Sequence, residues 1–435
     1  MRRRWPRVLA SLSIVVALVG AGGVAYAGQE AARLAANIHR SGALEAPPSE
    51  EGPSIQPVQV VPKLTQDTNI LIMGLDSRLD ENGKPLPAEV YDALHAGGDD
   101  VGGYNSNVLM LVHIPADGSK ATAISIPRDD YVQTAGFPGA GFKAKIKEAY
   151  GYGLEAARTA LLRQGKPDDD ATYQEARDAG RRAEIATVTK FLGSVHIDHF
   201  VEVTMAAFYQ VAQAVAPITV CVNRATRDTY SGADFHAGMQ QITAKQAVAF
   251  VRQRRDTSDP TYAFSDLDRE RRQQAFVVSV LHELKQAGTF TDLPKMEGVF
   301  DAVSKNIAVD TGLDLVQLAQ EATSLTGGSI SFTTLPITGF GWSPEGLSIN
   351  TVDVAQVQAV VRALLAPPKP STTAPAPSAS AAPAAVPALT GGAGAPGPAA
   401  QAASGTQAAA PSSSAPSVYA DWTGALQGGG IPCVK

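Results

Sequence analysis

The chain has 435 residues, of which 44% are hydrophobic, so it is long enough to form a substantial core. Its 36 Lys and Arg residues are outnumbered by 42 Asp and Glu residues, which excludes the globally basic surface that binds nucleic acid or anionic lipid nonspecifically. We therefore expect any anion-binding site to be local, and we expect no nucleic acid among the partners.

The first segment has the pattern of a membrane anchor. Arginines precede an apolar run from Val8 to Ala27, which is long enough to cross roughly 30 Å of hydrocarbon as a helix. The positive-inside rule then places the N-terminus inside the cell and all later residues outside it, in a single-pass protein of the cell membrane. A cleaved signal peptide is the alternative, because Ala25-Tyr26-Ala27 resembles a cleavage site. Both interpretations export the remainder of the chain.

Composition divides the chain into five predicted units. Residues 1–28 form the cytoplasmic stub and transmembrane anchor, and residues 29–62 form a tether that opens on a helix-compatible stretch. Residues 63–366 form the folded domain. Residues 367–418 are almost entirely Pro, Ala, Ser and Gly, which cannot offset the entropy of ordering, so we expect a disordered linker. Residues 419–435 regain large apolar side chains and are predicted to dock back onto the domain.

Two cysteines, Cys221 and Cys433, lie in the exported part of the chain. Oxidising conditions outside the cell favour a disulfide between them. The alternative is one buried free thiol and one frayed C-terminal tail.

Apolar runs alternate with helical patterns through the folded domain, which predicts a layered α/β fold. The predicted strands are Asn69–Leu75, Val108–Ile114, Thr122–Ile126, Ile218–Val222 and Phe332–Ile337. The predicted helices are Lys143–Leu162, Glu184–Leu192, Phe200–Val215, Ala244–Val251, Arg269–Leu284 and Val354–Leu365. The charged run between Arg163 and Arg182 is predicted to be a solvated insertion.

Two of the predicted strands end in charged side chains. Asp76 and Arg78 follow the first strand, and Arg128 follows the third. The carboxyl ends of strands are where open α/β sheets build their sites. Asp76 offers the hard oxygen ligand that Mg²⁺ takes, Arg78 offers a fork for phosphate, and Gly74 would let a ligand approach closely. The alternative for Asp76 and Arg78 is an ordinary ion pair at the surface.

The most informative group of residues lies further along the chain. Six arginines and no lysine occur between Phe250 and Gln274, and Arg269, Arg272 and Gln273 share one predicted helix face. Repeated use of arginine favours bidentate phosphate recognition, because lysine would serve solubility equally well. The alternative is a solvated helix face paired with neighbouring acidic residues. The arginines are at positions 252, 254, 255, 269, 271 and 272.

The segments 69–78, 125–129, 196–200 and 250–274 resemble, in order, the motifs of the LytR-CpsA-Psr family. The resemblance spans roughly residues 66–285. It implies a layered α/β/α domain with a central mixed sheet and a hydrophobic tunnel for a polyprenyl chain. It also implies transfer of a glycopolymer, such as teichoic acid, capsule or arabinogalactan, from a polyprenyl pyrophosphate to peptidoglycan, aided by Mg²⁺. The implied partners are therefore that lipid-linked glycopolymer, peptidoglycan and the membrane.

The same resemblance assigns roles to particular residues. Asp76 would bind the metal, and the side chains at the tunnel mouth would hold the pyrophosphate. Those side chains are Arg78, Arg128, Arg252, Arg254, Arg269 and Gln273, of which Arg128, Arg252 and Arg254 are also assigned with Asp76 to catalysis. The general base is not identified, with Asp129 and Asp268 as candidates.

One departure from the family pattern concerns the metal. The family places an Arg-x-Asp at the start of the second strand, and this chain has Asn105-Ser106-Asn107 there. Asn107 offers a neutral carbonyl in place of a second carboxylate, so we expect Mg²⁺ to be held weakly by Asp76 and Asn107.

Three alternatives follow from the sequence: a non-catalytic polyprenyl-phosphate binder, a lipid pyrophosphatase, and a membrane-linked transcription regulator. The predicted export of the arginine cluster opposes the last of these.

Overall fold

The structure is a computed structural model of the whole chain. It describes residues 38–45, 67–95, 97, 103–117, 119–287, 304–313, 330–367 and 424–435. The predicted anchor, most of the predicted tether and the predicted linker lie outside these residues. None of the helices that the structure describes is both long enough and apolar enough to cross a membrane.

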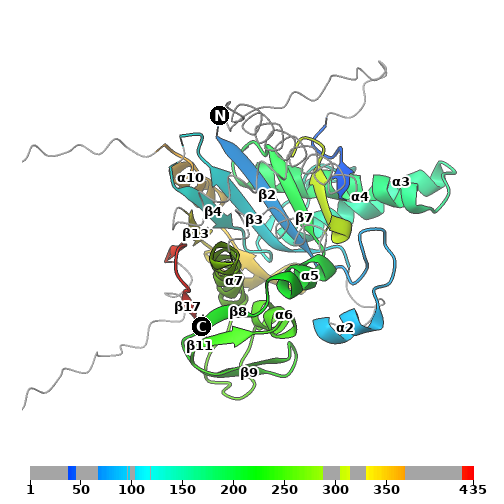
Figure 1. Cartoon of the computed structure of the whole chain (residues 1–435). Helices are drawn as coiled ribbons and strands as arrows, with labels where there is room; N and C mark the ends of the chain where they lie inside the picture. The colour runs from blue at the N-terminus through cyan, green and yellow to red at the C-terminus, as the bar shows by residue number, and fades with distance from the viewer. Residues whose placement is uncertain are drawn as a thin grey trace, which may run out of the picture.

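A mixed sheet forms the centre of the domain (Figure 1), which confirms the predicted α/β class. Its parallel pairs are β1–β12, β7–β2 and β4–β13, and its other neighbouring strands run antiparallel. In spatial order, the strands are β1 (His39–Ser41), β12 (Ile307–Asp310), β7 (His199–Val203), β2 (Thr68–Leu75), β3 (Ser106–Ile114), β4 (Ala121–Ser125), β13 (Ile330–Thr334) and β16 (Leu426–Gln427).

Helices cover both faces of this sheet, because its apolar side chains alternate between the two faces. In β3, Leu109 and Leu111 belong to one core cluster and Met110 belongs to the other. The first cluster is covered by α4 (Asp170–Phe191), against which α3 (Ala149–Arg163) packs, and by α10 (Val354–Leu364). The second is covered by α5 (Met205–Val215), α6 (Ala244–Arg252) and α7 (Asp266–Gln286). A short helix, α2 (Ala88–Leu94), lies against α5 and α6.

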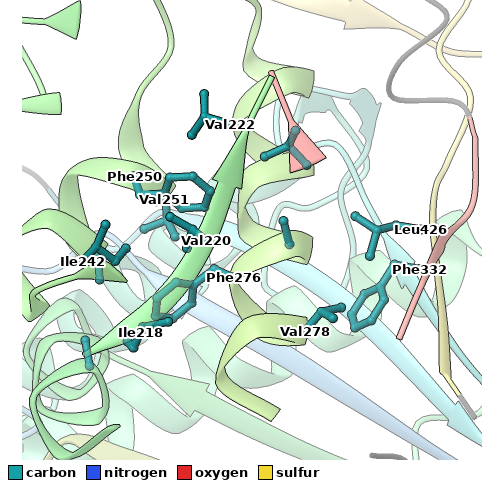
Figure 2. Packing of buried hydrophobic residues seen from close by; sticks show 14 of the residues in the cluster. Ile218, Val220, Val222, Ile242, Phe250, Val251, Phe276, Val278, Phe332 and Leu426 are labelled. Carbon is teal, nitrogen blue, oxygen red and sulfur yellow. The ribbon is translucent and has the colours of Figure 1, made fainter. Parts of the chain in front are cut away.

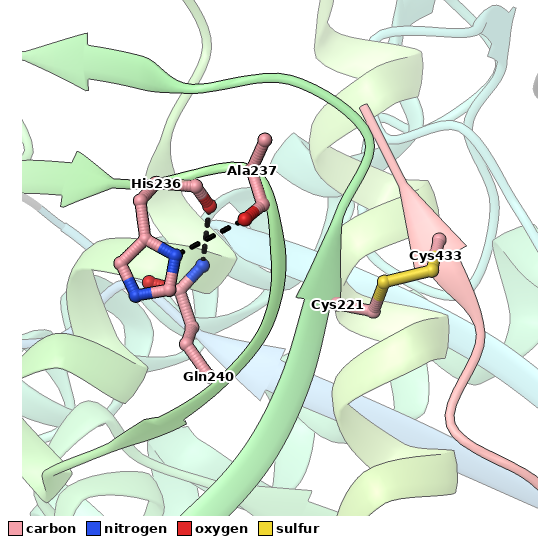
Figure 3. The surroundings of a disulfide bond; sticks show 5 residues. All are labelled: Cys221, His236, Ala237, Gln240 and Cys433. Atoms are coloured by element: carbon pink, nitrogen blue, oxygen red, sulfur yellow. Dashed lines mark hydrogen bonds between the residues drawn. A yellow bond between two sulfur atoms is a disulfide. The ribbon is translucent and has the colours of Figure 1, made fainter.

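A smaller sheet lies beyond α6 and α7. It has the order β11 (Gly238–Ile242), β8 (Ile218–Val222), β17 (Cys433–Val434), and the hairpin of β9 (Thr226–Asp228) and β10 (Ala233–Phe235) follows β8. Figure 2 shows Val220 of β8 packed with Phe250 of α6 and Phe276 of α7. A disulfide joins Cys221 to Cys433 across the parallel β8–β17 pair (Figure 3). Two further hairpins are β5 (Tyr131–Gln133) with β6 (Lys143–Lys145) and β14 (Gly339–Trp342) with β15 (Ser348–Thr351), and two 3-10 turns are η1 (Ile146–Glu148) and η3 (Ser304–Asn306).

Several predicted element boundaries are wrong because strand pairing is a long-range effect. The helix predicted from residue 143 begins at Ala149, since residues 143–145 pair with β5 instead. Residues 200–203 belong to β7, and Thr204 then caps α5 by accepting a hydrogen bond from the backbone N–H of Ala207. Residues 39–41, placed in the tether, form the edge strand β1.

The charged run at 163–182 is not a solvated insertion. Most of it is the N-terminal part of α4, which Asp169 caps by accepting a hydrogen bond from the N–H of Thr172. Arg177 and Arg181 of this helix are fully buried. Their guanidinium groups are paired with Glu81 and Glu202, and these four side chains are called the buried ionic cluster below.

Candidate functional site

Two adjoining cavities lie between the central sheet and the helices α5, α6 and α7. The apolar cavity has a volume of 340 Å³ and is lined by side chains of β2, β3 and these helices, among them Ile72, Met110 and Phe276. The polar cavity has a volume of 310 Å³. Four residues line both cavities, so the two are continuous: Asp76, Asn107, Arg252 and Arg269.

The segment after β2 places Asp76 at the junction of the two cavities. The backbone N–H of Asp76 donates to the carbonyl of Asn105 at 2.9 Å. Arg78 folds back over Asp76, and its Nη1 donates to the backbone carbonyl at 2.9 Å and to Oδ1 at 3.0 Å. A Cβ added at Gly74 would lie 2.8 Å from the Cβ of Val108, so this glycine is needed for the approach of β2 to β3. Gly74 also lines the apolar cavity.

A network centred on Asp266 holds two predicted phosphate ligands in place. Arg128 donates from Nε and Nη2 to the two oxygens of Asp266 at 3.0 and 2.9 Å, which is a bidentate pair. Arg269 donates from Nη2 to Asp266 Oδ2 at 3.0 Å. Burial opposes ionisation of Asp266, but the positive charges of Arg269 and Arg128 lower its pKa to about 2. Both arginines are therefore pre-oriented by a carboxylate that stays ionised.

Arg252, Arg254 and Gln273 complete the predicted set on the helix side. Arg252 Nη1 donates to the carbonyls of Leu94 and His95 at 2.5 and 3.1 Å, which fixes it at the end of α2. Burial, followed by the nearby charge of Arg78 and other arginines, lowers the pKa of Arg252 although Asp76 opposes the change. Arg254 is exposed at the rim of the polar cavity. Gln273 lines only the apolar cavity, and its Nε2 donates to the carbonyl of Val251 at 3.3 Å.

Arg272 does not belong to the site, which corrects its predicted place beside Arg269 and Gln273. Its side chain is buried away from both cavities, where Nε donates to the carbonyl of Lys435 at 2.6 Å. Its guanidinium lies 4.8 Å from the ring centre of Phe250 and 5.3 Å from that of Phe264. The function of this arginine is to pack the C-terminal segment and the smaller sheet against α7.

Sequence reasoning missed several residues of the polar cavity. Lys147 comes from η1, and Asp228, Tyr230 and Ser231 come from the β9–β10 hairpin. These segments are short and carry no hydrophobic period that could have placed them. Arg255 also lines this cavity; it belongs to the predicted arginine cluster but was not among the predicted pyrophosphate ligands.

Positive charge exceeds negative charge in the polar cavity. Its lining contains seven cationic residues and two acidic residues, Asp76 and Asp228. The two carboxylates that pair with its arginines from behind, Asp129 and Asp266, leave an excess of positive charge. The arrangement suits a ligand with several negative charges attached to a long apolar group. The cations are Arg78, Arg128, Lys147, Arg252, Arg254, Arg255 and Arg269.

The predicted metal ligands are brought together, but only one is a carboxylate. Oδ1 of Asp76 accepts from Arg78, which leaves Oδ2 for a cation, whereas Oδ1 of Asn107 already accepts from Arg128 Nη1 at 2.7 Å. Among the described residues, no group of three or more His, Cys, Asp or Glu side chains is arranged to hold a metal. The residues fit a Mg²⁺ ion that takes most of its oxygens from substrate phosphate and water.

Neither predicted general base faces the polar cavity. Asp129 Oδ1 forms an ion pair with Lys147 Nζ at 2.8 Å. Asp268 is buried, and its Oδ2 accepts from the backbone N–H of Ser265 at 2.7 Å as part of the cap of α7. Both carboxylates are used in holding the walls of the site.

Comparison with known proteins gives one family and several relatives. The sequence matches the LytR_cpsA_psr family over residues 29–364. It is 35% identical over 305 residues to the cell wall biosynthesis protein LcpA of Corynebacterium glutamicum, which covers 70% of this chain and 57% of LcpA. The chain thus spans little more than half the length of that relative.

Two further proteins illustrate the range of the similarity. The polyisoprenyl-teichoic acid–peptidoglycan teichoic acid transferase TagU of Oceanobacillus iheyensis is 25% identical over 359 residues, which covers 82% of this chain and 93% of TagU. Among solved structures, protein gbs0355 from Streptococcus agalactiae has a TM-score of 0.49 and 20% sequence identity, with 69% of this chain and 88% of that chain covered.

Proposed function

We propose, from the premise that this chain belongs to the LytR_cpsA_psr family, that it transfers a glycopolymer from a polyprenyl pyrophosphate to peptidoglycan. The similarity to TagU, a transferase of polyisoprenyl-linked teichoic acid to peptidoglycan, supports this class of reaction. The observation that carries the proposal is the junction of an apolar cavity with a cation-rich cavity through four shared residues. A polyprenyl chain fits the first cavity, and a pyrophosphate fits the second.

The arginines supply the electrostatic part of the reaction. An acceptor hydroxyl oxygen forms a bond to the phosphorus nearest the glycopolymer, while the bond from that phosphorus to the bridging oxygen breaks. The lipid leaves as a monophosphate that takes up the hydroxyl proton. Arg252 and Arg269 lie at the cavity junction, where they stabilise the charge that develops on the bridging oxygen as it leaves with the lipid phosphate. Arg128 and Arg254 lie further out and hold the transferred phosphate.

Magnesium fits this scheme as a supplement to the arginines. Asp76 would hold the ion through its free carboxylate oxygen, beside the neutral side chain of Asn107. When bound, Mg²⁺ would neutralise phosphate charge that the arginines do not reach. Asp76 itself orients Arg78, so this carboxylate positions a phosphate ligand with or without the ion.

The same proposal includes a location. A polyprenyl substrate resides in the membrane, and the apolar run from Val8 to Ala27 would anchor the domain beside it with the site outside the cell. This anchor lies outside the described residues.

A transfer assay tests the proposed function. The full-length protein in detergent would be given a short-chain polyprenyl-pyrophosphoryl oligosaccharide and peptidoglycan fragments, with and without Mg²⁺. We expect a phosphodiester-linked product that requires peptidoglycan and falls by at least about a hundredfold in Arg252→Ala. A released glycan phosphate without acceptor would instead indicate a lipid pyrophosphatase, and bound lipid without any product would indicate a non-catalytic binder.

A further inference from the structure

An exposed aromatic side chain stands at the rim of the polar cavity. Tyr230 lines this cavity, yet 67% of its surface is exposed, which makes it one of the most exposed large side chains among the described residues. The guanidinium of Arg255 lies over its ring, 4.0 Å from the ring centre. One face of the ring is thus covered by a cation and the ring borders the space where the phosphates are expected.

The turn that carries Tyr230 is held at three points. Asp228 accepts hydrogen bonds from the backbone N–H of Tyr230 at 2.9 Å and from the hydroxyl of Ser231 at 3.0 Å. The backbone carbonyl of Arg227 accepts from the N–H of Thr257 at 2.7 Å, which ties the hairpin to the chain after Arg255.

These hydrogen bonds fix the backbone of the turn, and the guanidinium of Arg255 covers one face of the ring and leaves the other face for a ligand. His95, directly after α2, supplies a backbone carbonyl to the predicted phosphate ligand Arg252. A ring held rigidly can stack on a ligand at little entropic cost. An aromatic ring suits the C–H face of a sugar, because that face is apolar and weakly positive whereas the ring face is negative.

We propose that Tyr230, supported by Arg255, is the subsite for the sugar bonded directly to the pyrophosphate of the lipid-linked donor. This inference rests on the proposed function and adds to it the recognition of the first donor sugar. The donor sugar is one bond from a phosphate that occupies the polar cavity, so it has to lie against the cavity wall. The acceptor glycan has to bring only one hydroxyl to the phosphorus, so it does not need to contact this wall of the cavity.

Binding of two synthetic lipids of equal charge tests the proposal. One is a short-chain polyprenyl pyrophosphate bearing N-acetylglucosamine, and the other bears a methyl group in place of the sugar. We expect wild-type protein to bind the sugar-bearing lipid about tenfold more tightly, since aromatic stacking and burial contribute an effect of this size. In Tyr230→Ala this gain should disappear while binding of the methyl lipid stays within about twofold.

Two further variants separate stacking from other effects. Tyr230→Phe keeps the ring and should retain the gain, and Tyr152→Ala removes another exposed tyrosine, 41% exposed, that lines neither cavity. A full sugar-dependent gain in Tyr230→Ala would overturn the subsite, as would equal binding of the two lipids by wild-type protein. Failure of wild-type protein to bind either lipid would contradict the proposed function itself, which keeps the two failures distinct.

Discussion

The polar cavity and the buried ionic cluster are both built from arginines and carboxylates, but their charge balance differs. In the buried ionic cluster, Arg177 and Arg181 meet Glu81 and Glu202, and each of these four side chains is at most 3% exposed. In the polar cavity, seven cations face two lining carboxylates, and Arg254 keeps 47% of its side chain exposed. The charges of the buried ionic cluster balance and its side chains are closed to ligands, whereas the polar cavity has an excess of positive charge and is open to them.

The comparison shows that arginine density alone does not identify an anion site. Arg177 and Arg181 come from a charged segment, yet their charge is satisfied internally, and they link α4 to β7 and to the loop that follows Arg78. In the polar cavity, Arg128 and Arg269 are held by the carboxylate of Asp266, and the lining cations outnumber the lining carboxylates. An excess of positive charge at the end of an apolar cavity is therefore the better mark of a phosphate site.

Breaking the buried ionic cluster should have the largest effect on stability. In Arg177→Met, Glu81 and Glu202 lose one of their two cations in a fully buried place, so we expect the free energy of unfolding to fall by about 3–5 kcal/mol. Arg254→Met is the matched change in the polar cavity and should cost at most about 0.5 kcal/mol, because the side chain is exposed. Denaturant unfolding measures both. Equal losses in the two variants would show that the two regions do not differ as described.

Removing an arginine from the polar cavity should weaken ligand binding and leave folding unchanged. Arg254→Ala is expected to weaken binding of a short-chain polyprenyl pyrophosphate about tenfold, since one charge-assisted hydrogen bond is lost at a partly solvated site. Isothermal titration calorimetry measures the change. Arg163→Ala removes an exposed arginine at the end of α3 and serves as the control. Unchanged affinity in Arg254→Ala would remove this arginine from the ligand set.

Glu202 of the buried ionic cluster and Glu270 behind the polar cavity should differ in their response to pH, although burial also raises the pKa of Glu81 within that cluster. Arg177 and Arg181 overcome the effect of burial and lower the pKa of Glu202 to about 2, whereas burial and the charge of Asp266 raise the pKa of Glu270, behind the polar cavity, to about 8. A raised pKa means that the native state holds a proton that the unfolded state has released. The contribution of protonated Glu270 to the free energy of unfolding is therefore complete below about pH 4.5, and it is lost as the pH rises towards 8.

Glu270→Gln should remove this dependence. Between pH 5 and 8, wild-type protein should lose stability relative to Glu270→Gln by on the order of 1 kcal/mol per pH unit, as measured by urea unfolding at several pH values. Glu345→Gln, at an exposed position, is the control and should follow the wild-type curve. A constant difference between wild-type protein and Glu270→Gln would show that Glu270 ionises normally.

The smallest expected effect concerns the metal. Asn107→Asp adds a carboxylate next to Asp76, where Arg128 already donates to residue 107, so folding should change little. We expect Mg²⁺ to bind several-fold more tightly in the presence of a polyprenyl pyrophosphate, because a second hard oxygen ligand with charge is added. Calorimetric titration with Mg²⁺ gives the result without reference to activity. No gain in affinity would place the metal away from residue 107.

The site residues that follow a strand or end a helix were predictable, because the hydrophobic patterns that place them are local in the sequence. Asp76 and Arg128 each follow an apolar run of strand length, and Arg252 ends a short amphipathic helix, so the pattern placed them at the edge of a sheet. The prediction for Arg272 was wrong because helical spacing shows which residues share a face of the helix but not which groups each side chain contacts. Its partners, Thr226 and Lys435, come from distant parts of the chain.

The missed features depend on long-range pairing or on elements too short to give a pattern. Burial of Arg177 requires Glu81 and Glu202, which are 96 and 25 residues away, so charge density in the segment suggested solvent exposure. Tyr230 sits on a two-strand hairpin of three-residue strands, which is too short for a periodic signal. The substitution of Asn107 for an expected carboxylate was visible in the sequence, but its bond to Arg128 was not.

Mass spectrometry of the lipid that accompanies the protein from membranes tests the central claim most directly. Full-length wild-type protein and Arg252→Ala would be purified in parallel without added ligand, with circular dichroism to establish that both are folded. We predict a polyprenyl phosphate or pyrophosphate in the wild-type sample and at least about a tenfold smaller amount in Arg252→Ala. Folded wild-type protein without such a lipid, or equal lipid in both samples, would contradict the assignment of the joined cavities to a polyprenyl pyrophosphate.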